Sequence, residues 1–284
     1  MKHDSFAVFI LSHGRPDKVV TAETLSRCGW RGKTFLVCDT GDARLDEYRA
    51  RFGAERVLAF DKASVDCDRA CNFTDLAGIL EARNVCFDLA REIGVEYFLE
   101  LDDDYTAFQF RYIDGEVLRT VECRDLSRVF DLFLDFLDCD ERIRTVSMAQ
   151  GGDLQGGAEN GDVRSEKFYR KAMNSFFCRT DRRVEFTGLL NEDVSCYAAD
   201  SARGHIYTQT NLVNLVQAPT QKNAGGITEA YRKYGTFTKS FFSVMAAPSC
   251  VRVETIGNLH RRIHHRINPR LAYPKILSEK WRRT

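Results

Sequence analysis

The chain has 284 residues, of which 44% are hydrophobic and 29% are charged, and this composition predicts a folded chain with a sizeable core rather than a disordered one. It contains no apolar run as long as a membrane span, and residues 1–4 do not resemble a signal peptide, so we expect a cytoplasmic protein with no membrane partner. Its ten cysteines include no CxxC pair, and we expect them to be reduced and mostly buried.

The formal net charge is zero, but the two signs are distributed unevenly along the chain. Residues 220–284 hold 13 lysines and arginines against three acidic residues, whereas residues 1–219 hold 28 against 38. A basic segment of this kind is typical of contact with a polyanion, and the alternative is a basic face that pairs with the acidic body. We therefore expect a main domain over residues 1–219 and a basic C-terminal segment, residues 220–284, packed on it.

The N-terminal half alternates between continuous apolar runs and amphipathic stretches, which indicates strands buried on both faces and helices between them. Strands are predicted at residues 6–11, 34–39, 56–61 and 97–102. Helices are predicted between them, ending near Gly29, Gly53 and Gly94, because glycine commonly follows the last helical turn. Pro16 suits the first turn after the first strand, and Asn72 is a candidate cap for the third helix.

The second half is less regular. Leu126, Val129, Phe130, Phe133 and Leu134 recur at helical spacing, and we expect this helix to be core packing. A strand is predicted at residues 145–149, a strand-like stretch at 168–180, and a turn followed by a helix at 189–204. The glycine-rich stretch 149–162 contains no phosphate-loop pattern, so it is predicted to be a loop.

Alternating strands and helices predict an α/β fold with a mostly parallel sheet and helices on both faces. In such sheets the ligand lies at the carboxyl ends of the strands. Four predicted strands end in polar residues at that edge: residues 12–15, Asp39, Asp61 and residues 102–104. The sequence therefore places the functional site there.

Three consecutive aspartates, Asp102, Asp103 and Asp104, follow the fourth predicted strand. Adjacent carboxylates repel one another, so they stay ionised only beside a cation. Mg²⁺ and Mn²⁺ bind carboxylate oxygens and leave positions for water and substrate phosphates. In an extended strand Asp102 and Asp104 point to one side, where they can hold the metal, and Asp103 points to the other, toward a sugar or a basic residue. The alternative is an exposed acidic turn.

Taken in order, these motifs resemble the GT-A nucleotide-sugar glycosyltransferases over residues 6–204. In that family a loop after the first strand and an acid after the second hold the nucleoside, and a helix with an Ala-Arg-Asn-like segment precedes the metal strand. The resemblance implies a GT-A (Rossmann-like) fold with a basic C-terminal extension, a Mn²⁺ or Mg²⁺ ion, and a nucleotide-sugar donor, a UDP-sugar first of all. The donor-binding residues that it implies are Ser12, His13, Gly14, Arg15, Asp39, Arg83, Asn84, Asp102 and Asp103.

The same resemblance implies roles for a later motif, Asn191-Glu192-Asp193, which opens the acceptor-side helix. Asp193 would be the general base of an inverting enzyme. Glu192 would bind the acceptor or serve as the base in place of Asp193. The alternative for both residues is helix capping. A C-terminal histidine often completes the metal site in that family. The candidates are His260, His264 and His265. In an extended segment the last two face opposite ways, so at most one would be a ligand, and contact with DNA phosphate is the alternative.

A narrower resemblance covers residues 225–253 and 262–277, which are similar to the C-terminal part of the phage glycosyltransferases associated with TET/JBP oxygenases. It implies sugar transfer to the hydroxymethyl group of a modified pyrimidine in phage DNA, 5-hydroxymethylcytosine first of all, and a separate oxygenase as a functional partner. Lys222, Arg261, Arg262 and Arg266 are then the candidate acceptor-binding residues. Two alternatives remain: a GT-A enzyme with a glycan, lipid or protein acceptor, and a DNA-binding protein without activity.

Overall fold

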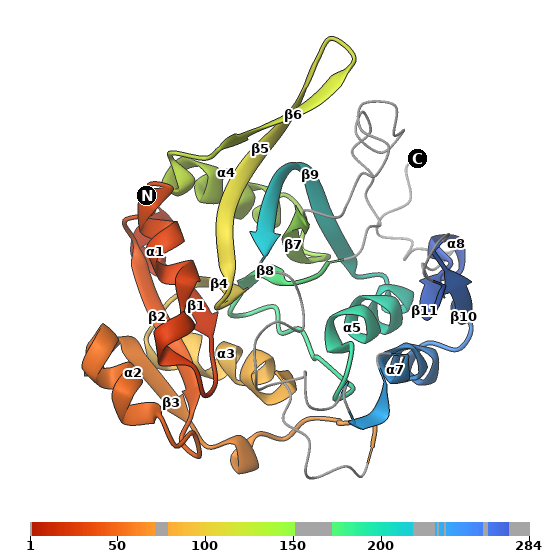
Figure 1. Cartoon of the computed structure of the whole chain (residues 1–284), viewed down its shortest axis with the longest axis horizontal. Helices are drawn as coiled ribbons and strands as arrows, with labels where there is room; N and C mark the ends of the chain where they lie inside the picture. The colour runs from red at the N-terminus through yellow and green to blue at the C-terminus, as the bar shows by residue number, and fades with distance from the viewer. Residues whose placement is uncertain are drawn as a thin grey trace.

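The computed structural model describes residues 2–71, 79–150, 172–217, 231, 233–235, 237–257 and 261–272. Within these ranges the chain forms a nine-stranded sheet with helices on both faces, and a separate two-stranded sheet near the C-terminus (Figure 1). No helix in the described ranges combines the length and the apolar character that crossing a membrane would require. The predicted cap Asn72 and most of the glycine-rich stretch 149–162 lie outside the described residues.

The four N-terminal strands form a parallel block in the order β3-β2-β1-β4. They are β1 (Phe6–Leu11), β2 (Lys33–Asp39), β3 (Val57–Phe60) and β4 (Tyr97–Asp102). All six residues of β1 are buried, as a continuous apolar run predicts for a central parallel strand. The predicted strands of this block are confirmed. Because they are parallel, their carboxyl ends lie at the same edge of the sheet, as predicted.

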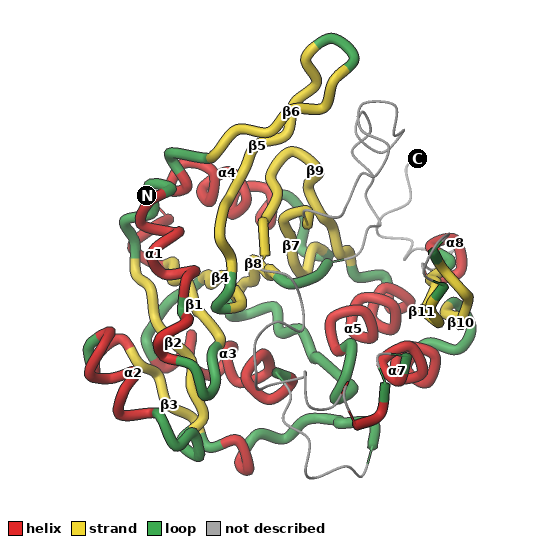
Figure 2. The backbone as a smooth tube through the Cα atoms, viewed as in Figure 1, coloured by secondary structure: helices red, strands yellow, loops and turns green. Residues whose placement is uncertain are grey.

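The other half of the sheet is mixed, in the order β8-β7-β9-β5-β6 beyond β4 (Figure 2). The strands are β5 (Tyr105–Asp114), β6 (Val117–Glu122), β7 (Ile143–Gln150), β8 (Ser175–Arg179) and β9 (Ile206–Gln217). β7 and β9 pair in parallel, while β8 runs antiparallel to both β4 and β7. The sheet is therefore parallel in its N-terminal block and mixed beyond it, and the β5–β6 hairpin and β9 were not predicted.

Helices cover both faces of the sheet. They are α1 (Val20–Arg27), α2 (Leu45–Phe52), α3 (Leu80–Glu92), α4 (Leu126–Asp138), α5 (Glu192–Asp200), α7 (Thr238–Ala246) and the short α8 (Pro269–Ala272). Short 3₁₀ helices span Lys2–Ser5, Pro16–Lys18, Ala54–Arg56, Lys62–Ser64 and Ser201–Arg203. Gly53 follows α2 with a φ of 93°, a conformation that glycine adopts without strain, so the predicted stop signal is confirmed.

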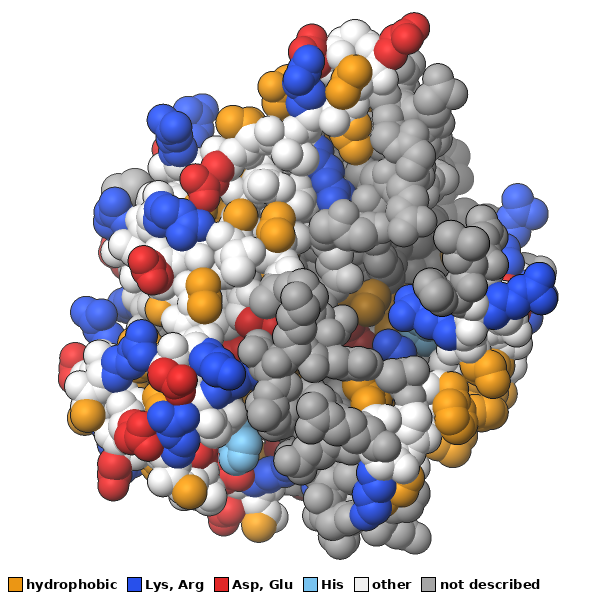
Figure 3. Space-filling view, in the orientation of Figure 1, with side chains coloured by type: hydrophobic (Ala, Val, Ile, Leu, Met, Phe, Trp, Pro, Cys, Tyr) orange, Lys and Arg blue, Asp and Glu red, His pale blue; other side chains and the backbone are white. Residues whose placement is uncertain are grey.

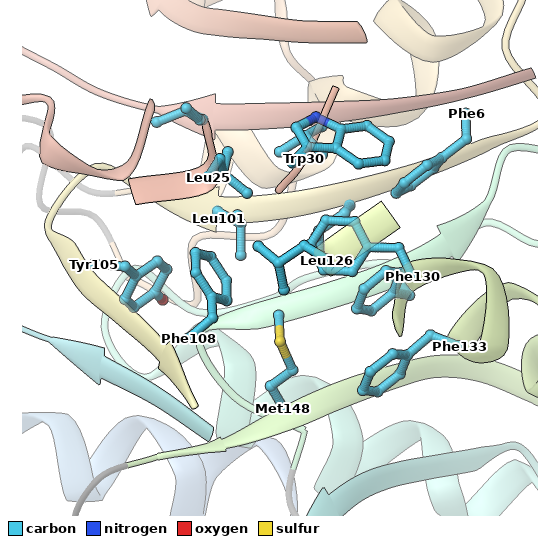
Figure 4. Packing of buried hydrophobic residues seen from close by; sticks show 14 of the residues in the cluster. Phe6, Leu25, Trp30, Leu101, Tyr105, Phe108, Leu126, Phe130, Phe133 and Met148 are labelled. Carbon is cyan, nitrogen blue, oxygen red and sulfur yellow. The ribbon is translucent and has the colours of Figure 1, made fainter. Parts of the chain in front are cut away.

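The two faces of β1 belong to two different cores because side chains alternate along a strand. Phe6 packs with Phe130 of α4 and Phe177 of β8 on one face (Figure 4). Phe9 packs on the other face with Phe98, in the core that contains α3 and α5. The predicted packing role of α4 is thus confirmed. The strands that lead to the site lie between the two cores.

The C-terminal part adds a small unit beside α5. β10 (Val251–Ile256) and β11 (Arg262–Ile267) form an antiparallel hairpin of their own. Helix α7 packs against α5 and against both strands of this hairpin. The sequence analysis predicted a basic segment here but none of these elements.

Candidate active site

The acidic cluster lies where β4 ends. Asp102 is the last residue of the strand, and Asp103 and Asp104 form the turn that leads into β5. The predicted side-chain directions assumed that the extended strand continues through Asp104, whereas the chain turns at Asp103 and Asp104. Their side chains nevertheless have different surroundings: Asp103 is fully buried, whereas Asp102 and Asp104 are partly exposed. The three carboxylates therefore have different tasks.

Asp103 ties the loop after β1 to the end of β4. Its Oδ2 accepts hydrogen bonds from Ser12 Oγ at 2.5 Å and from Arg15 Nε at 2.8 Å, and its Oδ1 lies 2.7 Å from Arg15 Nη2. Burial raises the pKa of Asp103, and the charge of Arg15 opposes that rise. Asp103 was predicted to contact either a sugar or a basic residue, and in the structure it contacts the basic residue Arg15. Its bonds to Ser12 and Arg15 fix the conformation of the predicted donor loop.

Two further residues hold the same loop, and the sequence analysis missed both. Asp42 Oδ2 accepts a hydrogen bond from the backbone N–H of Gly14 at 2.6 Å and lies 3.5 Å from Nδ1 of His13. Tyr48 OH accepts from the backbone N–H of Arg15 at 2.9 Å. Both residues belong to a stretch that reads as an ordinary amphipathic helix, and no local signal marks them.

Asp39 stands at the end of β2, as predicted. Its Oδ1 accepts hydrogen bonds from the backbone N–H groups of Gly41 at 3.0 Å and Lys62 at 3.4 Å. These bonds join the ends of β2 and β3. The carboxylate of Asp39 is half-buried, so one side of it is open to solvent.

Arg83 lies at the centre of a buried charge network. Its Nε donates to Glu192 Oε1 at 2.9 Å, and its two Nη atoms donate to Asp102 Oδ1 at 3.2 Å and Glu100 Oε2 at 3.4 Å. Its guanidinium carbon also lies 4.9 Å from the centre of the Phe176 ring, a cation–π distance. Because the side chain is 2% exposed, Arg83 contacts the acidic strand and the α5 helix and offers no surface to a donor.

Asn84 is likewise buried. Its Nδ2 donates to the carbonyl oxygens of Leu80 and Phe186, at 3.0 and 2.9 Å, and its Oδ1 accepts from the N–H of Phe186 at 3.1 Å. These bonds fix the segment that leads to α5. Arg83 and Asn84, both predicted to bind the donor, are therefore buried and hydrogen-bonded to other groups of the protein.

Glu192 and Asp193 occupy the first turn of α5, where the preceding Asn191 has a φ of 64°. Glu192 receives the bond from Arg83, and Asp193 Oδ1 accepts from the N–H of Val194 at 2.7 Å. Burial, and then the adjacent carboxylate of Glu192, raise the pKa of Asp193 to about 7. A carboxylate in this state can accept a proton near neutral pH.

Asp104 carries the least compensated charge of the three aspartates. Its Oδ1 accepts one hydrogen bond, from Gln217 Nε2 at 3.0 Å. Burial and the charge of Asp102 raise its pKa to about 6. Two neighbouring carboxylates, one of them destabilised as an anion, form a donor set that fits a hard divalent cation.

The structure does not group His264 or His265 with the acidic turn as a metal site. Across the described ranges, no three His, Cys, Asp or Glu side chains are grouped so that they could hold a metal ion. The rings of His264 and His265 lie 4.2 Å apart, so they lean toward each other instead of facing opposite sides of the strand as expected. Nδ1 of His265 lies 3.2 Å from the Asn191 amide, which connects β11 to the start of α5.

The predicted acceptor-binding arginines lie on the C-terminal hairpin. Arg261, Arg262 and Arg266 are exposed, and Nη1 of Arg266 lies 2.9 Å from Glu254. Residues 231–272 include seven described lysines and arginines and a single described acidic residue, Glu254. Figure 3 shows basic side chains gathered over α8, β10 and β11. Lys222 and His260 lie outside the described residues.

The fold is that of the GT-A nucleotide-sugar glycosyltransferases. The mannosyltransferase PcManGT from Pyrobaculum calidifontis, solved with GDP-Man and Mn²⁺, is 13% identical, with a TM-score of 0.51 over 85% of this chain and 62% of its own. Glucosyl-3-phosphoglycerate synthase from Mycobacterium tuberculosis, solved with Mg²⁺ and UDP, is 12% identical, with a TM-score of 0.48 over 93% and 87% of the two chains.

The family model of the TET-associated glycosyltransferases matches residues 6–226, which is more than half of the chain. The chain therefore belongs to this family and is a glycosyltransferase. No curated protein is similar enough to count as a match. Because the members of this family are described as glycosyltransferases, the alternative of a DNA-binding protein without activity is rejected.

Replacing Arg83 tests the buried network. Arg83→Leu should lower the free energy of unfolding by about 3–5 kcal/mol, because it leaves three carboxylates without their common cation. Arg91→Leu is the matched control on the same helix, since Arg91 forms only an exposed pair with Asp88, and it should change stability by about 0.5 kcal/mol or less. Urea unfolding measures both.

The loss in the Arg83 variant should also depend on pH. Burial raises the pKa of Glu100 to about 8, against the charge of Arg83, so removing Arg83 raises it further. A carboxyl group whose folded-state pKa exceeds its unfolded value contributes stability that is lost as the pH rises. The destabilisation should therefore be smaller at about pH 5 than at about pH 8. Equal losses at both pH values, or in both variants, would contradict the network.

Proposed function

We propose that the chain transfers a sugar from a nucleotide-sugar donor to the hydroxymethyl group of a modified pyrimidine in DNA, 5-hydroxymethylcytosine first of all. The observation that carries the proposal is that Arg83 pairs both with Asp102, at the start of the acidic turn, and with Glu192, the neighbour of Asp193 in the first turn of α5. This arrangement sets a metal-binding pair and a proton acceptor on one rigid frame. The family description and the basic C-terminal hairpin support the choice of acceptor.

Asp102 and Asp104 would hold a Mn²⁺ or Mg²⁺ ion, because their carboxylates are the two of the cluster that remain partly exposed. Such an ion acts as a Lewis acid that neutralises charge on the leaving diphosphate. The first-strand loop, held by Asp103, Asp42 and Tyr48, would receive the nucleoside together with Asp39, and a UDP-sugar is our first choice of donor.

Asp193 would take the proton in the transfer step. The hydroxymethyl oxygen of the acceptor forms a bond to the anomeric carbon while the bond from that carbon to the diphosphate oxygen breaks. The hydroxyl proton passes to the Asp193 carboxylate, and the electron pair of the broken bond leaves with the diphosphate. Attack opposite the leaving group inverts the anomeric centre. Glu192, held by Arg83, keeps Asp193 in an electrostatic setting that favours proton uptake.

A DNA acceptor is supported by the excess of positive charge on the C-terminal hairpin, which packs beside the helix that carries Asp193. Phosphates of a polynucleotide are attracted to such a surface whatever their sequence. A glycan, lipid or protein acceptor would not require this charge. A separate TET/JBP-like oxygenase would supply the hydroxymethyl group, since oxidation of a pyrimidine methyl group makes it.

Asp104→Ala tests the metal pair. The variant should retain its fold and lose transfer to below about 1% of the parent rate, because the ion loses one of its two carboxylates. Asp114→Ala, at the exposed far end of β5, is the control and should retain the parent rate. Binding of Mn²⁺ in the presence of UDP, followed by calorimetry, should weaken in Asp104→Ala alone. Unchanged activity of the parent in excess chelator would refute the metal assignment.

Asp193→Asn tests the base. Transfer should fall by about 10²–10⁴-fold while donor and acceptor still bind, because the amide cannot accept the proton. In the parent, kcat/KM should rise with pH and level off above about 7, since the base works only when ionised and its pKa is about 7. That ascending limb should be missing from Asp193→Asn. A decrease of less than about tenfold would place the base elsewhere.

The acceptor is tested by incubating the protein with labelled sugar nucleotides and with plain or hydroxymethylated DNA. Only hydroxymethylated DNA should become labelled. A combined Arg261→Gln, Arg262→Gln and Arg266→Gln variant should bind DNA with a shallower salt dependence, by about 0.9 in log–log slope per lost phosphate contact. Arg49, Arg51 and Arg56, exposed around α2, form the control triple. Absence of label with every common donor would leave the glycan, lipid and protein acceptors.

A further inference from the structure

Lys239 is a half-buried cation close to the proposed base. It lies in the first turn of α7, the helix that packs against α5 and against the C-terminal hairpin. Its Nζ is 5.6 Å from the centre of the Tyr231 ring, which packs in the small core formed by Leu189, Leu190 and Phe242, directly before the Asn191-Glu192-Asp193 motif. The side chain therefore points toward the start of α5.

No carboxylate in the described part of the chain lies within ion-pair distance of Lys239. Among the described residues its ammonium group contacts the Tyr231 ring, and the charge of Asp193 acts on it only from a longer distance. A partly desolvated ammonium without a counter-ion is unfavourable. Its place in the first turn of a helix is also unfavourable, because that end of the helix dipole is positive. Neither packing nor local electrostatics explains a lysine here, whereas an anionic ligand would.

The surroundings of Lys239 define where such an anion would lie. Burial lowers the pKa of Lys239, and so does the positive charge of Arg262, while the negative charge of Asp193 raises it. Lys239 is thus within electrostatic reach of both the proposed base and an exposed arginine of β11. Lys239 and Arg262 lie on α7 and β11, which pack against each other, and α7 also packs against α5, which carries Asp193. Together the two cations make this side of Asp193 electrostatically positive.

We propose that Lys239, with Arg262 beside it, binds the phosphate on the 5′ side of the acceptor nucleotide while Asp193 receives that nucleotide's hydroxymethyl group. The inference rests on the proposed function. In a nucleotide with the usual anti base, the substituent on C5 of a pyrimidine lies on the side of the base that faces its own 5′ phosphate. A hydroxymethyl group at Asp193 therefore brings that phosphate to the neighbouring positive site.

The experiment combines a protein change with a change of charge at one phosphate. Oligonucleotides contain one 5-hydroxymethylcytosine and a single neutral methylphosphonate, placed either at the linkage on its 5′ side or at a linkage several nucleotides away. Transfer of labelled sugar is measured for the parent, for Lys239→Gln, for Lys239→Arg, and for the control Lys233→Gln. Lys233 is an exposed lysine of the same region, so this control removes the same charge elsewhere.

The parent should lose about tenfold in kcat/KM when the 5′ linkage is neutral, the loss expected for one charge-assisted hydrogen bond, and should tolerate the distant substitution. The kcat/KM of Lys239→Gln on natural DNA should already be about tenfold below that of the parent. The neutral 5′ linkage should lower it by no more than about a further twofold, because the interaction with that phosphate is already absent. Lys239→Arg and Lys233→Gln should keep the parent's sensitivity.

A Lys239→Gln protein that loses as much as the parent from the neutral 5′ linkage would overturn the inference, and so would a parent that is insensitive to that linkage. These results leave the proposed function intact, because transfer to hydroxymethylcytosine is still observed. Absence of transfer by the parent to any of the oligonucleotides would overturn the proposed function and the inference together.

Discussion

The active-site region depends on one buried interaction, the contact of the Arg83 guanidinium with three carboxylates from two separate parts of the chain. Glu100 and Asp102 belong to the strand that carries the acidic turn, and Glu192 opens the helix that carries Asp193. A planar guanidinium presents five donors on three nitrogen atoms in a fixed fork, so each of the three carboxylates meets a different nitrogen, whereas a lysine has one nitrogen atom for all three. The two halves of the site are therefore held at one separation by a buried residue.

The remaining acidic residues differ in how deeply they are buried and in how far neighbouring groups compensate their negative charge. Asp103 is paired with Arg15 and hydrogen-bonded to Ser12, and it shapes a loop. Asp104 is only partly compensated and suits a cation, whereas Asp193 lies in surroundings that favour its protonated form. Chemically identical side chains are thus a structural tie, a proposed metal ligand and a proposed base, according to what surrounds them.

Much of the fold could be predicted from the sequence where a local pattern decides the structure. The buried runs of β1 and β4 and the periodicity of α4 are examples, since each depends on residues within one element. The β5–β6 hairpin had a usable signal, the Asp114-Gly115 turn, which the triple aspartate before it obscured.

The candidate site was predictable only in outline. The gathering of polar strand ends follows from the parallel order of β1, β2 and β4, so the place of the site could be inferred. The partners of Arg83 could not, because Glu192 lies 109 positions away in the chain. Nor could the buried state of Arg83 and Asn84, which depends on how α3 packs beneath the sheet. The position of the motif suggested that Arg83 and Asn84 contact the donor, whereas the tertiary packing buries both side chains.

The burial of Asp193 has a consequence for the evolution of this chain. A carboxyl group whose pKa is raised in the folded state costs more stability as the pH increases, so the native protein is less stable near neutral pH than a variant with a neutral side chain at this position. Selection for thermal robustness alone would therefore remove the very group proposed to drive turnover. Laboratory evolution of a more stable enzyme therefore has to screen for product as well as for heat resistance, because a neutral side chain at position 193 is expected to raise stability and lower activity together.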